Sequence, residues 1–294
     1  MTTPVTPQTT GAQAMAQVIA AAPEPFLVGL PGGHTMAIFD AIRDLPGVTA
    51  VLAREESIAT VIAENHGRST GRAPVVMAQG AWLLGVGGAG IMEAHLGASP
   101  LVVVADTTES DTFSHLGAYQ AGFGGYGAFD LATALGAMTK RTFVATSPIQ
   151  AVEMLQLAFL HATSGEPGPV AVVLHSRAIL GSLGEHAGRV DLARPLSPVH
   201  PTPSAAAVAE AAALIGSAER PVVVLGNGAR GGAEAVRAFV EACDIPYVST
   251  SGGKGVLPED APLSAGVIGN FGHDLANRTL GEADAVVVFG SKLS

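Results

Sequence analysis

The sequence predicts an α/β protein built from two doubly wound parallel-sheet domains, and we expect the second to be incomplete within these residues. Three observations carry this prediction. Apolar runs of strand length alternate with segments of helical periodicity along most of the 294 residues. Runs such as residues 100–106 (PLVVVAD) are apolar, as expected of strands buried on both faces. The 37 glycines and 19 prolines have no period and indicate tight turns between short elements.

The composition restricts what the protein can bind. Hydrophobic residues make up 48 % of the chain and charged residues 14 %, which is enough apolar material for large buried interiors. The formal net charge of −10 argues against nucleic acid and against an anionic membrane, because both are bound mainly through basic patches. Small molecules and other proteins remain as partners. No signal peptide and no membrane-length apolar run are visible, so we expect a cytoplasmic protein.

The first elements form a strand, a glycine turn, a helix and a second strand. Helical spacing at residues 12–22 ends before two prolines, and the apolar run 26–30 follows as a strand. After the turn PGGHT, residues 36–45 have helical spacing, and Pro46-Gly47 stops that helix before the strand 48–53.

Glu56 opens the next helix, where a strand gives way to a helical pattern. Open parallel sheets present side chains to ligands at such switches. A carboxylate there can perform acid–base chemistry, or it can simply be an N-terminal helix acid stabilised by the helix dipole. In the helix itself, Ile58, Val61 and Ile62 are predicted to form the core stripe, with Glu64 facing elsewhere.

The first domain then continues the same alternation. The aperiodic segment 107–131 is the exception, since it is rich in glycine and aromatic residues and its length suggests that it covers a site. The other expected elements are a strand at 73–78, a glycine-rich loop and helix at 79–98, the strand 100–106, a helix-like stretch at 131–145, a helix at 148–165 and a strand at 169–174.

The domain boundaries follow from a change of composition. We expect a first domain at residues 1–180, a linker without periodicity at 181–203 and a second domain at 204–294. The single cysteine, Cys243, lies in an apolar helical pattern and is expected to be a buried small hydrophobe. The expected elements of the second domain are a helix at 204–218, a strand at 221–226, a helix at 233–244, a strand and loop at 246–255 and a strand at 283–294. Because this alternation stops after an apolar strand, we expect another polypeptide to complete the fold.

Seven motifs in order resemble one enzyme group. They are GLPGGHT, AREES, GRSTGR, AHLGASPLVVVAD, MTKRTF, SGEPGPVAVVL and ERPVVVLGNGAR. Together they resemble the thiamine diphosphate enzymes of the acetolactate synthase, benzaldehyde lyase and 2-hydroxyacyl-CoA lyase group. The resemblance implies that the first domain binds the pyrimidine ring of thiamine diphosphate and that the remainder begins the central, Rossmann-like domain.

The resemblance also implies that the cofactor site is shared. Such enzymes hold the diphosphate and Mg²⁺ with a Gly-Asp-Gly motif and a following Asn, and no Gly-Asp-Gly occurs in these residues. We therefore expect a split enzyme whose second subunit binds the diphosphate and the metal, in a hetero-oligomer with at least two copies of each subunit. No metal ligand is expected in this chain. The LGNGAR turn is like those that hold FAD or ADP in some relatives, but such a ligand is not expected here.

The site residues follow from the same resemblance. Arg54-Glu55-Glu56 matches the family's Arg-His-Glu strand end, which makes Glu56 the residue that pairs with N1′ of the aminopyrimidine and activates the cofactor, while Glu55 departs from the family pattern. His34 falls where benzaldehyde lyase-like members carry an active-site His and acetolactate synthases have an apolar residue. It is either a proton shuttle or a hydrogen-bonded turn residue.

Two further groups are implied to contact the cofactor or substrate. Gln120, in AYQAG, matches a family glutamine, and the alternative is a solvated loop amide. Cofactor contacts are expected at Pro31, Gly32 and Gly33 of the PGGHT turn and at Gly80 of QGAW, next to a Trp82 that either lines the pocket, meets the partner or belongs to the core.

These expectations combine into one functional prediction. The chain is expected to be a subunit of a thiamine diphosphate-dependent C–C bond lyase or carboligase acting on 2-hydroxyacyl, acyloin or 2-oxo acid substrates, with Glu56 activating the cofactor. The nearest alternative is a subunit of an acetolactate synthase-like enzyme or a simple 2-oxo acid decarboxylase. An alternative of another class is a non-catalytic regulatory or scaffold subunit.

Overall fold

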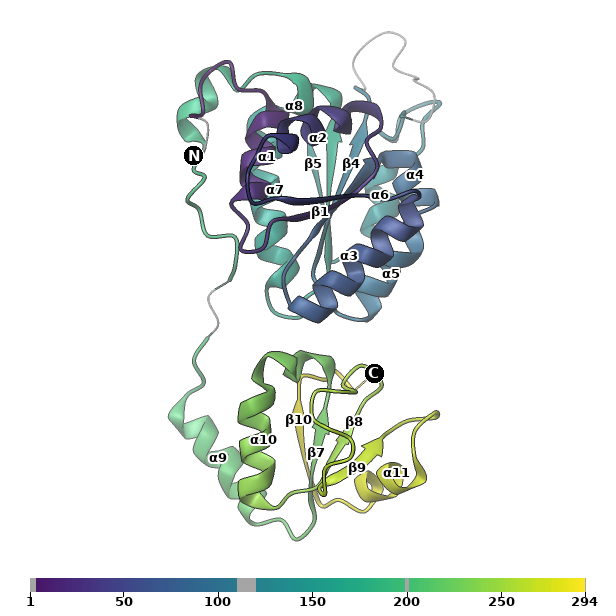
Figure 1. The fold of residues 1–294 in the computed structure, drawn as a ribbon, viewed down its shortest axis with the longest axis vertical. Helices are drawn as coiled ribbons and strands as arrows, with labels where there is room; N and C mark the ends of the chain where they lie inside the picture. Colours follow the sequence, from purple (N-terminus) through teal and green to yellow (C-terminus); the bar gives the residue numbers. More distant parts are fainter. Residues whose placement is uncertain (1–3, 110–119, 199–200, 294) are drawn as a thin grey trace. The chain divides into compact units, whose positions relative to one another are not determined.

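The computed structural model describes residues 4–109, 120–198 and 201–293. The chain folds as two compact units, one within residues 1–199 and one within 200–294 (Figure 1). Both are α/β units with a parallel sheet, which confirms the predicted fold class.

The first unit has a six-stranded parallel sheet in the order β2-β1-β3-β4-β6-β5. Its strands are β1 (Phe26–Gly29), β2 (Thr49–Leu52), β3 (Val75–Gln79), β4 (Leu101–Thr107), β5 (Arg141–Ala145) and β6 (Pro169–His175). The register is continuous across the centre, where Val76 is paired with Val103 and Val103 with Ala171. Strands β3, β4 and β6 are buried over nearly their whole length, because helices cover both faces of the sheet.

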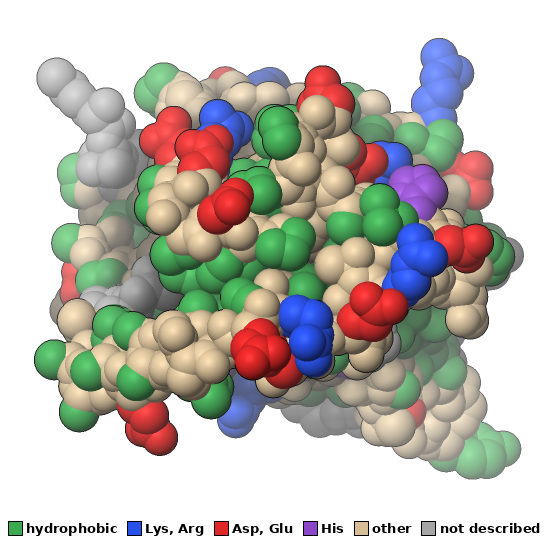
Figure 2. All heavy atoms as spheres, turned by 90° about the horizontal axis from the view of Figure 1, so that it is seen from below, with side chains coloured by type: hydrophobic (Ala, Val, Ile, Leu, Met, Phe, Trp, Pro, Cys, Tyr) green, Lys and Arg blue, Asp and Glu red, His purple; other side chains and the backbone are tan. Residues whose placement is uncertain are grey.

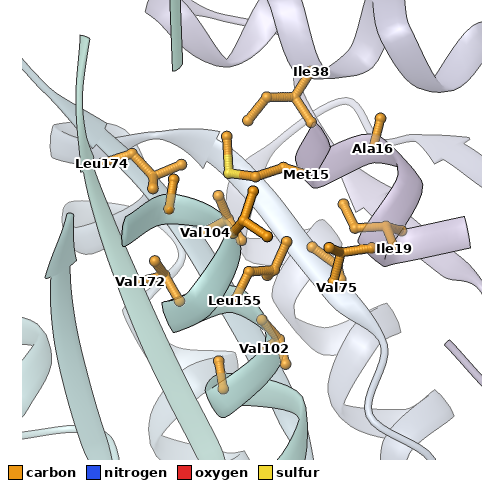
Figure 3. Close-up of a cluster of buried hydrophobic side chains, with 14 of the residues drawn as sticks. Met15, Ala16, Ile19, Ile38, Val75, Val102, Val104, Leu155, Val172 and Leu174 are labelled. Atoms are coloured by element: carbon orange, nitrogen blue, oxygen red, sulfur yellow. The ribbon is translucent and has the colours of Figure 1, made fainter. Parts of the chain in front are cut away.

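One face of this sheet is covered by α1 (Gly11–Ala20), α2 (Met36–Arg43), α7 (Pro148–Thr163) and α8 (Ser176–Leu180). Figure 3 shows this layer, where Met15 and Ile19 of α1 and Leu155 of α7 meet the strand residues Val75 and Val102. The other face is covered by α3 (Glu56–Thr70), α4 (Gly80–Gly85), α5 (Gly88–Leu96) and α6 (Leu131–Gly136). Residues 184–189 form a 3-10 helix, η2 (Gly184–Arg189), and the neighbouring Leu183 and Leu196 are buried in the α1 and α7 layer.

The second unit has a four-stranded parallel sheet in the order β10-β7-β8-β9. Its strands are β7 (Pro221–Leu225), β8 (Tyr247–Ser249), β9 (Ser264–Val267) and β10 (Ala285–Phe289), and its helices are α9 (Ala205–Gly216), α10 (Ala233–Cys243) and α11 (Asp274–Gly281). Helices α10 and α11 cover opposite faces, since Val236 and Val240 belong to one apolar cluster and Ala276 to the other. None of the residues of α9 is buried.

The predicted core stripe of α3 is wrong for Ile58 and Val61, although Ile62 packs against the core as expected. Ile58 and Val61 are exposed, whereas the helix buries Ala59, Ala63 and Glu64. The reason is a close approach of helices and loops: a Cβ on Gly67 would lie 2.2 Å from the carbonyl oxygen of Pro100, and a Cβ on Gly90 of α5 would lie 2.4 Å from Thr60 Oγ1. The small residues Ala59, Ala63 and Gly67 allow this approach, and Ile58 and Val61 face outward. The buried Glu64 accepts a hydrogen bond from Ser99 Oγ at 2.8 Å.

Other local predictions also need correction. The stretch predicted as helix-like at 131–145 contains the short helix α6 followed by the edge strand β5, whose Arg141 is exposed, so the strand lacks a fully apolar pattern. Strand β9 was not predicted, because it has only four residues and a glycine at positive φ. Helix α11, which follows it, was not predicted either. Cys243 is exposed at the last turn of α10, not buried.

Two surface findings concern the partner classes. No helix among the described residues is long and apolar enough to cross a membrane. Figure 2 shows one face of the molecule, on which the basic side chains are scattered, several of them beside acidic ones.

Candidate functional site

The site lies where the order of the strands reverses. From β1 the chain passes through α2 to β2 on one side, and it returns through α3 to β3 on the other side of β1. In open parallel sheets, ligands bind beyond the carboxyl ends of the strands at such a reversal. The turn 30–35 follows β1 there, Gly80 follows β3, and Asp106 lies near the end of β4, in register with Gln79.

Asp106 holds the two turns together. Its Oδ2 accepts a hydrogen bond from the backbone N–H of His34 at 2.7 Å and lies 3.1 Å from Nδ1 of the His34 ring. Its Oδ1 accepts a hydrogen bond from the backbone N–H of Gly80 at 3.1 Å. The carboxylate is fully buried, whereas the His34 side chain is 22 % exposed. One buried acid therefore joins the turns after β1 and β3.

The glycines of these turns are required by this packing. Gly33 has φ +55°, and a Cβ there would lie 2.4 Å from Asp106 Oδ2. A Cβ on Gly80 would lie 2.3 Å from the carbonyl oxygen of Asp106. Gly32 differs, because its backbone is extended and a Cβ on it would lie 3.5 Å from the nearest atom, in the Gln79 side chain. Gly32 thus leaves room beside Gln79, and Pro31 before it is exposed.

Gln120 is brought to the same turn. Its amide nitrogen would lie 3.2 Å from a Cβ on Gly33, so its side chain reaches the glycine turn. The backbone carbonyl oxygen of Gln120 accepts hydrogen bonds from Thr107 Oγ1 at 3.1 Å and from the backbone N–H groups of Thr108 and Gly122 at 3.0 and 2.9 Å. These bonds fix Gln120 beside the end of β4. Residues 110–119 of the aperiodic segment that is expected to cover a site lie outside the described residues.

Glu56 is at the same edge of the sheet but makes no hydrogen bond with this group of described residues. It is the first residue of α3, four residues after the end of β2, and it is partly exposed. Within the part of the chain that the structure describes, its carboxylate has no hydrogen bond or ion pair. Glu55, the residue before it, accepts a hydrogen bond from Ser57 Oγ at 3.0 Å. The carboxylate of Glu56 is therefore available to a ligand.

Sequence reasoning missed Asp106. The signal was present, because a carboxylate ends an otherwise apolar strand at the edge where the other candidates were placed. Trp82 of α4 is 43 % exposed and so does not belong to the core. Over residues 4–109, 120–198 and 201–293, no group of His, Cys, Asp and Glu is arranged to hold a metal ion.

The glycine turn of the second unit uses its own N–H groups internally. Gly226 N–H donates to the carbonyl oxygen of Phe289 at 2.8 Å, and Gly228 N–H donates to that of Gly290 at 3.0 Å. A Cβ on Gly226 would lie 2.2 Å from the same Gly290 oxygen. These glycines pack the turn after β7 against the turn after β10, so two N–H groups that could bind a phosphate are occupied.

Comparison with known proteins identifies both units. Residues 9–126 match the family model described as "Thiamine pyrophosphate enzyme, N-terminal TPP binding domain", and residues 208–294 match "Thiamine pyrophosphate enzyme, central domain". Thiamine pyrophosphate is another name for thiamine diphosphate.

Similar whole sequences agree with these matches. The chain is 30 % identical to a probable acetolactate synthase large subunit of Methanocaldococcus jannaschii, over 97 % of this chain and 47 % of that protein. It is 30 % identical to the acetolactate synthase large subunit of Corynebacterium glutamicum, over 96 % and 44 %, and 28 % identical to that of Lactococcus lactis, over 97 % and 48 %. The chain thus spans about half the length of the curated relatives it matches. It belongs to the thiamine pyrophosphate enzymes, of which it carries the N-terminal TPP-binding domain and the central domain.

Proposed function

We propose that this chain is the pyrimidine-binding subunit of a thiamine diphosphate-dependent C–C bond lyase or carboligase acting on 2-hydroxyacyl, acyloin or 2-oxo acid substrates. The observation that carries the proposal is Glu56, a carboxylate without a partner among the described residues, at the carboxyl edge of the sheet beside the site. A free carboxyl group there fits a ring nitrogen of an aminopyrimidine. The bound cofactor would supply a carbon nucleophile for the substrate carbonyl.

The residues of this chain would bind the pyrimidine ring and transfer protons. Glu56 would hold a proton at the pyrimidine nitrogen, and the turn of Pro31, Gly32 and Gly33 together with Gly80 would bound the ring. His34 and Gln120, which reach the same turn, would exchange protons with the substrate or orient it. The diphosphate and Mg²⁺ would be held by a second subunit, in an assembly with at least two copies of each chain.

The alternative within the same class is an acetolactate synthase-like enzyme, or a simple 2-oxo acid decarboxylase. The specific observation in favour of acetolactate synthase is that the relatives named above are its large subunits. His34 favours the lyase, because its imidazole can exchange a proton with a substrate hydroxyl. Assay of the reconstituted complex with pyruvate and with a 2-hydroxyacyl-CoA separates the two reactions.

Exchange of one carboxyl group tests the catalytic proposal. Glu56→Gln should lower thiamine diphosphate-dependent turnover of the reconstituted complex by roughly 10²–10⁴, the range for a positioned acid–base group. The matched control is Glu55→Gln, because Glu55 is adjacent and exposed, and its carboxylate accepts a hydrogen bond from Ser57 Oγ. This control should keep turnover within about threefold of the unchanged protein, on the order of the spread of surface substitutions.

Two results would contradict the proposal. If Glu56→Gln leaves turnover unchanged, the chain is a non-catalytic regulatory or scaffold subunit. If the chain alone turns over substrate with thiamine diphosphate and Mg²⁺, the second subunit is not needed for the diphosphate and metal.

A further inference from the structure

Asp106 is a buried acid held by donors from two turns and facing one titratable side chain. A carboxylate removed from water is costly to bury unless donors replace the lost solvent. Asp106 is 1 % exposed and receives two backbone N–H groups, from His34 and Gly80. Its third neighbour is the His34 ring, at 3.1 Å. The same oxygen thus accepts from the backbone of His34 and faces the side chain of His34.

This contact selects one form of the imidazole. An ionised carboxylate can only accept hydrogen bonds, so the ring nitrogen that faces it must carry the hydrogen. The neutral ring is therefore protonated at Nδ1, and Nε2 is left as the acceptor. Nε2 has no hydrogen-bond partner in the described parts of the chain, and the His34 side chain is partly exposed. The nitrogen that can exchange a proton is thus the one without a protein partner.

The position of the ring is coupled to the second turn. Because Asp106 also accepts from Gly80 N–H, it sets His34 relative to the turn after β3. The side chain of Gln120 reaches Gly33, in the turn that carries the His34 ring. The ring therefore stands among the residues that are proposed above to contact the cofactor or substrate.

We propose that Asp106 is a positioning residue that holds His34 as the Nδ1–H tautomer, so that His34 Nε2 exchanges a proton with the hydroxyl or carbonyl oxygen of the substrate. This rests on the proposed function. When the C–C bond of a substrate bearing a hydroxyl group breaks, the hydroxyl proton passes to Nε2, the oxygen becomes a carbonyl, and the electron pair of the broken bond is left on the other carbon, for which the bound cofactor would be the electron sink. The resulting imidazolium is stabilised by the Asp106 carboxylate, and it returns the proton when a carbonyl oxygen becomes a hydroxyl.

The tautomer is tested without any turnover. Nitrogen and carbon NMR shifts of histidine-labelled protein, with the His34 signal assigned by its loss in His34→Ala, should show hydrogen at Nδ1 at alkaline pH. In Asp106→Asn the same signal should move toward hydrogen at Nε2. A His34 ring with hydrogen at Nε2 in the unchanged protein would overturn the proposal, and this result does not depend on whether Asp106→Asn folds.

The functional coupling is tested in the reconstituted complex. Asp106→Asn should lower kcat by about 10², and the same exchange made in His34→Ala should lower it by less than about threefold, because contacting residues that act through one another are not additive. Asp130→Asn is the control, since Asp130 caps α6 by accepting from Thr133 N–H and lies on the surface. If the losses from Asp106→Asn and His34→Ala simply multiply, Asp106 is structural only.

The two proposals fail in different ways. If Glu56→Gln has no effect on turnover while the NMR signal shows hydrogen at Nδ1, the thiamine diphosphate mechanism is wrong but the Asp106–His34 pair stands. If Glu56→Gln abolishes turnover and the His34 ring carries its hydrogen at Nε2, the mechanism stands and the role of Asp106 is wrong.

Discussion

At the scale of single residues, one oxygen atom of Asp106 lies so close to the backbone of residue 33 that no side chain fits there. Asp106 Oδ2 lies where a Cβ on residue 33 would come within 2.4 Å, and residue 33 also has φ +55°. Two separate costs therefore forbid a side chain there: the left-handed backbone and the collision with a buried carboxylate. Gly184 has the same φ of +55° but no atom within 4 Å of a Cβ, so it carries only the first cost.

The pair Gly33→Ala and Gly184→Ala separates these costs. Gly184→Ala should lower the free energy of unfolding by about 1–2 kcal/mol, the cost of a left-handed residue with a Cβ. Gly33→Ala should lower it by at least about 1 kcal/mol more, because the carboxylate must move away from its donors. Urea unfolding of both variants measures the difference. Equal losses would mean that the turn relaxes without disturbing Asp106.

At the scale of elements, the packing of β5 against α7 makes stability depend on pH. His161, in the last turn of α7, lies beside Phe143 of β5, with ring centroids 5.9 Å apart. Burial, followed by the nearby charges of Arg141 and Lys140, lowers the pKa of His161 below its ordinary value of 6.5. The folded protein therefore binds fewer protons at this site than the unfolded chain as the pH falls below about 6.5.

His161→Gln should remove this contribution. In the unchanged protein, His161 contributes a loss of stability that begins as the pH falls through 6.5 and levels off below its lowered pKa. The free energy of unfolding of the variant should fall less steeply over that pH window. Above about pH 7.5, its difference from the unchanged protein should not vary with pH. Chemical unfolding at a series of pH values measures this, with His95→Gln on the exposed face of α5 as the control. The same slope in His161→Gln as in the unchanged protein would contradict the assignment.

The sequence pattern predicted the strands that are buried on both faces. It did not predict features that depend on contacts with segments distant in the chain. Strands β3, β4 and β6 are apolar except at their carboxyl ends, so their positions were predictable. The orientation of α3 was not, because Gly67 and Gly90 reveal a close helix approach only once the facing Pro100 and Thr60 are known. An edge strand such as β5 has one open side and no distinct pattern.

The same contrast applies to the site. The positions of Glu56, His34 and Gly80 at one sheet edge follow from the order of strands and turns, which alternation in the sequence predicts. The hydrogen bonds of Asp106 join residues 72 and 26 positions apart in the chain. No local pattern encodes such a contact, so the acid that organises the turns appeared only in the structure.

At the scale of the whole molecule, the two units have separate interiors. Each of the four apolar clusters formed by the described residues lies within one unit, two in each. Leu155 is buried in the first unit and Leu225 in the second, both at 1 % exposure or less. Loss of packing in one interior should therefore leave the other unchanged.

Matched truncations test this independence. Leu155→Ala and Leu225→Ala should each cost about 2–5 kcal/mol in the unit that contains the leucine. Hydrogen exchange followed by mass spectrometry should show faster exchange only in peptides from that unit. Faster exchange in both units for either variant would show that they unfold together.

The carboxylate shared by two turns also has an evolutionary consequence. A lineage that replaces His34 by an apolar residue leaves the Asp106 charge buried with one donor fewer, and one that replaces Asp106 by a small neutral residue frees the ring to adopt the other tautomer. A protein with only one of the two replacements should be less stable than one that has both His34 and Asp106 or one that has neither. Positions 34 and 106 should therefore covary among homologues, and an alignment of lyases with carboligases would display the two states as alternatives inherited together.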